Sequence, residues 1–258
     1  GPRARFTVLT STTPALAHNC GYQGGAAAFR AFADVYRLDL GKLAEQARKT
    51  IPPEVLAEAK DFYRFAVEKK FHRGMPEHIF VVCESLKRLW RAAHPRTVEL
   101  WSACSNAFRS ALDTPNVNFH AGHRVIYRRS GNWMYARLPS GRILCYPQPR
   151  VEEDGTLSFM GINQYTRKWE RLKTFAGRLA ENITQAAARD VITTSMPVAE
   201  HHGYEIVLTV HDELVTEAPD SDEFNADHLA AIMSDSTGWR QGLPLAAAGY
   251  EGYRYRKD

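Results

Sequence analysis

The segment 204–217, near the end of the 258-residue chain, constrains the fold more than any other. Apolar residues alternate with polar or β-branched ones from Tyr204 to Val210, which is the two-residue period of a β-strand. A polar triplet interrupts this run, and β-prone residues then resume up to Glu217. Two β-prone runs around a short polar interruption predict a β-hairpin, with His211, Asp212 and Glu213 at its tip.

Two neighbouring carboxylates at this tip, those of Asp212 and Glu213, allow two interpretations. Like charges repel each other unless a cation lies between them. Mg²⁺ is such a cation, and proteins bind it through one or two carboxylates together with substrate phosphates. The tip is therefore either a metal-binding site or an ordinary solvated polar turn.

The string Val210-His-Asp-Glu-Leu214 between two strands resembles motif C of the family A (polymerase I-like) DNA polymerases, in particular those of phage type. The resemblance implies that Asp212 binds catalytic Mg²⁺ in the palm, with His211 and Glu213 as further catalytic residues. It also implies primer–template DNA and dNTP as partners. The implied location is the cytoplasm of a bacterial cell that hosts a phage or prophage.

Tyr22 lies among glycines in the segment 21–25, Gly-Tyr-Gln-Gly-Gly. Together with the hairpin, this segment resembles the end of motif B, where a Tyr lies beside the nascent base pair. The resemblance implies that Tyr22 binds the nucleotide. The family carries an apolar residue and two triphosphate-holding cations, an Lys and an Arg, at four-residue steps before this Tyr. Here those positions hold His18, Pro14 and Thr10, so no cation occupies the Arg or Lys position.

Residues 26–112 show helical apolar spacing throughout. We expect helices over 26–35, 42–50, 53–70 and 78–93, with a continuation from Pro95 to Leu112. Apolar stripes of this kind form a core far more often than a binding surface. The region 20–112 is therefore expected to be a helical, fingers-like region.

The pattern changes to a β period after residue 112. Short β-prone runs at 116–119, 124–128, 133–137 and 142–146, separated by turn residues, predict a meander. A polar loop over 147–155 and a further strand over 157–163 follow. With the hairpin, this region, 113–258, is expected to be palm-like. The fold class is α/β (α+β), an antiparallel polymerase palm sheet with a helical fingers region and with thumb and exonuclease absent.

Residues 166–202 predict one long helix, followed by a shorter piece after Pro197. At about 100° per residue, a polar stripe shares one face of this helix. Its members are Arg171, Arg178, Asn182, Gln185 and Arg189. Such a stripe is either a solvated face or a DNA-binding surface that contacts phosphates and minor-groove acceptors. Segment 181–190 resembles the family's palm helix, whose primer–template-contacting Gln corresponds to Gln185.

Composition limits which kinds of protein and which partners remain possible for this chain. A hydrophobic content of 44 % and a formal net charge of only +4 argue against general disorder. Arg124, Arg128 and Arg129 form a basic cluster, which is either a solvated face or a surface suited to a polyanion. No apolar run reaches membrane-spanning length, so no membrane partner is expected. The four cysteines lack metal-ligand spacing, which favours free thiols in a reducing compartment. Gly1-Pro2 resembles the remnant of a cleaved tag, and 1–19 is expected to be an atypical N-terminal segment.

The family's motif A, Asp-x-Ser-x-x-Glu-x-Arg, is not found in the sequence. The resemblance therefore leaves two hypotheses. In the first, the chain is the C-terminal fingers and palm part of a DNA polymerase and needs a partner chain that supplies motif A. In the second, it is a catalytically inactive, polymerase-derived DNA-binding or regulatory module.

Overall fold

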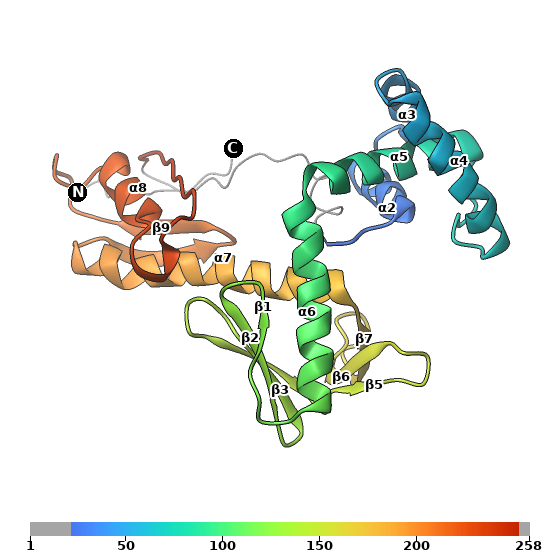
Figure 1. Ribbon diagram of the computed structural model, residues 1–258. Coiled ribbons are helices and arrows are strands. Elements are labelled where there is room, and N and C mark those ends of the chain that lie inside the picture. The colour runs from blue at the N-terminus through green and yellow to red at the C-terminus, as the bar shows by residue number, and fades with distance from the viewer. Residues whose placement is uncertain (1–21, 253–258) are drawn as a thin grey trace. The chain divides into compact units, whose positions relative to one another are not determined.

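The computed structural model describes residues 22–252, which form a mixed α/β fold with antiparallel strands, as predicted (Figure 1). The expectations for residues 1–19, including those for Thr10, Pro14 and His18, lie outside the described residues. The described chain divides into two compact units. One comprises residues 22–136 and 145–182, and the other comprises 137–144 and 183–252. The expected regions, 20–112 and 113–258, have bounds that differ from those of the two compact units, so this division stays a prediction.

Helices open the first unit, close to the predicted bounds. They are α2 (Ala26–Tyr36), α3 (Leu40–Arg48), α4 (Pro53–Glu68), α5 (Glu77–Ala93) and α6 (Pro95–Asp113). Pro53 and Pro95 start α4 and α6, at a position where the missing N–H costs nothing. Asp39 caps α3 by accepting a hydrogen bond from the Lys42 N–H. The apolar stripes form a core, in which Phe29, Phe80 and Cys83 are buried.

Two antiparallel sheets follow. The first has the order β1-β2-β3-β4, from β1 (Phe119–Ala121), β2 (Val125–Ser130), β3 (Trp133–Arg137) and β4 (Ile143–Pro147), which confirms the meander. Helix α6 lies along β1 and β2 (Figure 1), and its Phe108 ring meets Tyr127 at 5.8 Å between centroids. The second sheet has the order β5-β6-β7, from β5 (Arg150–Val151), β6 (Leu157–Ile162) and β7 (Trp169–Thr174). Strand β5 lies within the segment expected to be a loop.

The prediction of one helix over 166–202 is wrong at its start. Residues Trp169–Thr174 form strand β7, which pairs with β6, and helix α7 begins only at Ala176. Pairing of Leu157 with Thr174 places apolar and small residues of both strands on a buried face, and this tertiary contact overrides helix propensity. The expected break at Pro197 is also wrong. Helix α7 (Ala176–His201) passes through it, because an exposed proline removes only one backbone hydrogen bond.

The second unit contains the predicted hairpin. It consists of β8 (Glu205–Val210), β9 (Glu213–Glu217), helix α8 (Ala226–Ser234) and the short 3₁₀ helix η1 (Gly238–Arg240). Tyr204, Leu214 and Leu229 are fully buried, in one core cluster with the buried Ile192 and Ala199 of α7. The Tyr204 hydroxyl donates to the Asn225 carbonyl, at 3.2 Å, which satisfies the polar end of the buried ring. No helix in the described part of the chain is long and apolar enough to cross a membrane.

Candidate active site and nucleic-acid interface

The hairpin β8–β9 places His211 and Asp212 in a two-residue turn. Its two strands are antiparallel, as the sequence led us to expect, and the last pair before the turn is Val210 with Glu213. His211 has a φ of +53°, in the left-handed region that a tight hairpin turn requires. Asp212 is half-buried. The turn therefore presents the Asp212 carboxylate at the end of two strands that are held by a core.

Glu213 does not belong to the turn, which corrects the predicted tip. It is the first residue of β9 and is only 7 % exposed, and the strand continues through the buried residues Leu214 to Thr216. The two neighbouring carboxylates therefore lie in different environments, one in a turn and the other in a buried strand. A buried carboxylate must be compensated, so Glu213 is more constrained than Asp212.

A bulge in β8 lies close to the turn. The register shifts between Ile206 and Leu208, so that Val207 has no direct partner in β9. In a regular strand Leu208 would lie on the same face as Ile206, and Val207 on the opposite face. Instead, the two consecutive residues are both exposed, Val207 at 46 % and Leu208 at 49 %. The inserted residue turns the following side chains to the other face, as a β-bulge does.

Helix α7 is joined to this turn and to the segment 137–144. The Arg189 guanidinium donates to the His211 carbonyl at 3.4 Å. The next residue, Asp190, has a side chain that is 8 % exposed. It accepts a hydrogen bond from the Ser140 hydroxyl and forms an ion pair with Arg142, with Nε and Oδ1 2.6 Å apart. Breaking one partner of a buried pair leaves an uncompensated charge. This network therefore fixes the part of α7 that lies at the hairpin.

Four members of the predicted polar stripe lie on α7, at spacings of four, three and four residues. They are Arg178, Asn182, Gln185 and Arg189. Three of them are exposed, whereas Asn182 is half-buried and donates to the Tyr146 hydroxyl at 3.3 Å. Burial raises the pKa of Tyr146 to about 12, so its phenol stays neutral. The shared helix is confirmed, and contact of these side chains with DNA stays a prediction.

Arg171 is not part of that stripe, because it lies on β7. Its guanidinium donates to the Gln148 carbonyl and to the Ser158 hydroxyl, each at 3.0 Å, and lies 3.9 Å from the Glu152 carboxylate. These contacts fix it within its own sheet. In the basic cluster, Arg129 is similarly engaged with the Leu112 carbonyl.

The turn that carries Tyr22 is tied to the start of α7 within the first unit. Gln23 has a φ of +66°, and its side-chain oxygen accepts the Gly177 N–H at 3.0 Å. A Cβ at position 177 would overlap the Tyr22 carbonyl oxygen, so only glycine allows this approach. Arg91 lies over the Trp101 ring, 5.3 Å from its centroid, with its Nη2 3.5 Å from the Gln23 carbonyl.

Five supporting residues were not predicted from the sequence pattern: Arg91, Ser140, Arg142, Gly177 and Asp190. A glycine inside a helical pattern was an available signal for Gly177, since such a glycine often marks a close backbone approach. The Arg189-Asp190 pair within the motif-like segment 181–190 gave no indication that Asp190 is buried. Its partners lie in a turn that is distant in the sequence.

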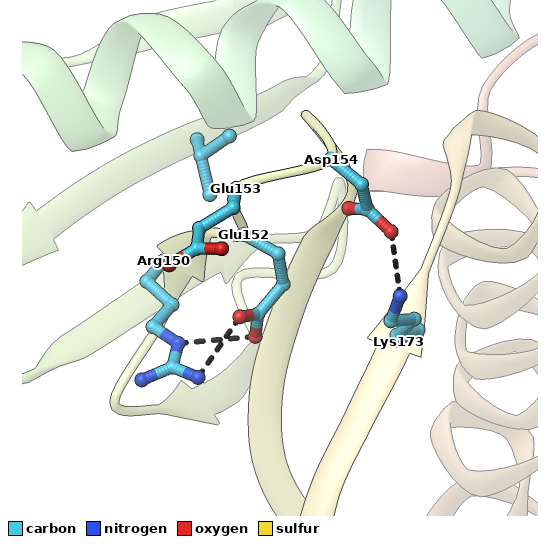
Figure 2. Close-up of a pocket in the computed structure, with 6 residues that line it drawn as sticks. Arg150, Glu152, Glu153, Asp154 and Lys173 are labelled. Atoms are coloured by element: carbon cyan, nitrogen blue, oxygen red, sulfur yellow. Dashed lines mark hydrogen bonds and ion pairs between the residues drawn. The ribbon is translucent and has the colours of Figure 1, made fainter.

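A hollow of about 480 Å³ lies beside β5 and β7 (Figure 2). Two of its three carboxylates, Glu152 and Asp154, are paired with cations. Arg150 contacts Glu152 at 2.9–3.0 Å, and the Lys173 ammonium lies 2.6 Å from Asp154. Lys173 holds the pKa of Asp154 well below its usual range, and Arg150 lowers that of Glu152. Glu152 and Asp154 are therefore already neutralised, and the exposed Glu153 alone does not make a cation site.

Metal binding at the hairpin depends on the donor atoms that the described residues offer. Across residues 22–252, no three or more His, Cys, Asp or Glu side chains gather as a metal site. Asp212 supplies one hard oxygen donor in a half-buried turn, and Mg²⁺ is often held by one or two carboxylates with water and phosphate completing its shell. Asp212 therefore fits as one ligand of a shared site.

Comparison with known proteins identifies a relative of this chain. The DNA polymerase of Bacillus phage SP02 is 34 % identical to this chain over 179 residues. The similarity covers 67 % of this chain and 27 % of the phage protein, so the chain spans about a quarter of the length of that relative. No family model and no solved structure matches the chain. The sequence similarity indicates a relationship to a phage DNA polymerase.

Proposed function

We propose that this chain is the C-terminal fingers and palm part of a family A DNA polymerase of phage type, which takes part in DNA replication by template-directed nucleotidyl transfer. The observation that carries the proposal is the β8–β9 hairpin, whose two-residue turn contains Asp212. The similarity to a phage DNA polymerase supports it independently. The proposed site of action is the cytoplasm of a bacterial host.

In this proposal Asp212 holds Mg²⁺ together with substrate phosphates. When bound, the metal lowers the pKa of the attacking primer hydroxyl and stabilises charge on the leaving oxygens. His211 and Glu213 flank the ligand, and the buried start of β9 keeps the Asp212 backbone in place. Preorganisation of this kind matters because the carboxylate then needs no reorganisation during the reaction.

Tyr22 and the stripe of α7 are assigned the binding of substrates. Tyr22 lies beside the nascent base pair, on a turn that Arg91 and Gly177 hold in position. The exposed Arg178, Gln185 and Arg189 contact the primer–template, together with Asn182. Arginine side chains neutralise phosphates, and side-chain amides suit the acceptors of the minor groove.

The second metal-binding carboxylate, which belongs to motif A, is proposed to come from a partner chain. Two-metal sites hold ions about 3.5–4 Å apart, and one fixed carboxylate such as that of Asp212 cannot hold both. The chain alone should therefore lack activity. Each lost electrostatic partner of this type costs about 10²–10³ in rate, although such losses are not additive.

The test is extension of a labelled primer by the purified chain with Mg²⁺ and all four nucleotides, beside an Asp212→Ala variant. We expect no extension, or traces, from the chain alone, and extension that depends on Asp212 when a polypeptide carrying motif A is added. Robust extension by the chain alone that Asp212→Ala abolishes would contradict the need for a partner. Extension with the partner that is unaffected by Asp212→Ala would exclude Asp212 as the metal ligand.

A second candidate function is an inactive, polymerase-derived DNA-binding or regulatory module. The observation that favours it is the sequence before Tyr22, where Thr10 and Pro14 stand at the positions of the two triphosphate-holding cations. In that case the chain binds primer–template DNA with the same affinity in the wild type and in Asp212→Ala, and no partner restores extension.

A further inference from the structure

The tip of the β6–β7 hairpin exposes an unusual set of apolar side chains. Tyr165 is 97 % exposed, Ile162 61 % and Trp169 58 %. Ile162 and Trp169 are direct partners across the two strands, and Tyr165 lies in the loop between them. Single exposed apolar residues are ordinary, but two rings and an isoleucine within one hairpin tip indicate a binding surface.

The loop that presents Tyr165 is closed by its own hydrogen bonds. The Asn163 side-chain oxygen accepts the N–H groups of Tyr165, at 2.8 Å, and Thr166, at 3.3 Å. The Asn163 backbone N–H donates to the Lys168 carbonyl at 2.9 Å, and Arg167 has a φ of +58°. A ring on such a defined backbone loses little freedom when it binds a ligand, which favours binding.

The charge around these rings is positive. Arg167 and Lys168 are exposed in the loop beside Tyr165 and Trp169. The nearby carboxylate of Glu170 accepts a hydrogen bond from the Asn163 side-chain amide. Proteins that bind single-stranded nucleic acids combine cations, which contact the backbone, with aromatic rings on which bases stack.

We propose that the β6–β7 tip binds single-stranded DNA, with Tyr165 and Trp169 stacking on bases and Arg167 and Lys168 contacting phosphates. Base faces are available in a single strand but are covered by neighbouring pairs in a duplex, so the rings select unpaired bases. The inference goes beyond the proposed function and uses other residues, because the stripe of α7 is assigned to paired primer–template.

The test measures the fluorescence anisotropy of a labelled oligothymidylate with the full chain and its variants. Tyr165→Ala and Trp169→Ala should each weaken binding by about 5- to 140-fold, since stacking contributes about 1–3 kcal/mol per base. Tyr165→Phe/Trp169→Phe keeps both rings and should bind as the wild type does. The matched control, Phe71→Ala/Trp133→Ala, removes two rings that are 58 % and 43 % exposed elsewhere and should leave the affinity unchanged.

Several results would overturn the proposal. One is that the wild type binds no oligothymidylate at all, and another is that the alanine variants bind it with the affinity of the wild type. A third such result is that the control variant loses as much affinity as the alanine variants do. A change from dimer to monomer in the alanine variants, measured by light scattering, would make the tip a protein interface instead. Affinity for a blunt duplex should not respond to the tip variants, so failure here is distinguishable from failure of the proposed function.

A second measurement does not depend on alanine variants. Oligothymidylate should quench tryptophan fluorescence of the wild-type chain, and Trp169→Phe, which keeps a ring at this position, should remove part of that quenching. Unchanged quenching in Trp169→Phe would show that Trp169 contacts no base.

Discussion

The hairpins β6–β7 and β8–β9 are both antiparallel, but they distribute apolar residues in opposite ways. In β8–β9 the turn is polar and the strand β9 is buried, with Leu214 at 0 % exposure. In β6–β7 the exposed apolar side chains concentrate at the tip, around Tyr165 and Trp169. Burial explains why β8–β9 forms and holds its turn. It does not explain rings that are exposed in the folded chain, and the proposed binding of single-stranded DNA at the β6–β7 tip would account for them.

The largest expected difference between the two hairpins is in stability. Leu214→Ala should lower the free energy of unfolding by about 2–5 kcal/mol, because it removes a fully buried side chain from a core with Tyr204 and Leu229. Trp169→Ala, at the exposed tip, should change it by less than about 0.5 kcal/mol. Urea denaturation of both variants measures this. Similar losses in the two variants would mean that the β6–β7 tip is part of a core.

A smaller effect is expected for Asn163→Ala, which tests how the β6–β7 tip is held. The change removes the acceptor of the Tyr165 and Thr166 N–H groups and should cost about 1–2 kcal/mol. Gln164→Ala, at the exposed neighbouring position, is the control and should cost less than about 0.5 kcal/mol. The measurement is again urea denaturation. Equal effects of the two substitutions would show that the hydrogen bonds to the Asn163 side chain do not stabilise the loop.

The smallest effect concerns pH and the base of β6–β7. The lowered pKa values of Asp154 and Glu152 mean that their contribution to stability is present above the ordinary carboxyl pKa. That contribution is lost as pH falls through the lowered folded-state values. Lys173→Met should raise the pKa of Asp154 in an NMR titration, whereas Lys168→Met should not. If the Asp154 titration were unchanged in Lys173→Met, the Lys173–Asp154 ion pair would not be the cause of the lowered pKa. The change in stability should be slight, because both groups are exposed and screened.

Some helices and strands could be predicted from the sequence, and others could not. Pro53, Pro95 and regular apolar spacing mark the helices, and local alternation marks β8, so these elements were predicted to within a few residues. Strand β7 was missed because Glu170 to Lys173 suit a helix, and their pairing with β6 is decided by tertiary contact. Arg171 was consequently placed on the wrong element.

In the candidate site, the positions of the functional side chains could be predicted, but the contacts that hold them in place could not. The turn of Asp212 follows from a local pattern, and so does the shared face of Arg178 and Arg189. The burial of Glu213, the ion pair of Asp190 and the contact of Gly177 with the Tyr22 turn depend on residues distant in sequence. Periodicity carries no information on such contacts.

The proposed function requires that α7 bind primer–template DNA, and a salt titration of that affinity tests this claim most directly. Arg178→Ala/Arg189→Ala should weaken binding and reduce the slope of log K against log salt by about 0.9 per lost phosphate contact. The control, Arg64→Ala/Arg96→Ala, removes the same charge from exposed positions on α4 and α6 and should leave the slope unchanged. Equal slopes for the wild type and the α7 variant would contradict the account.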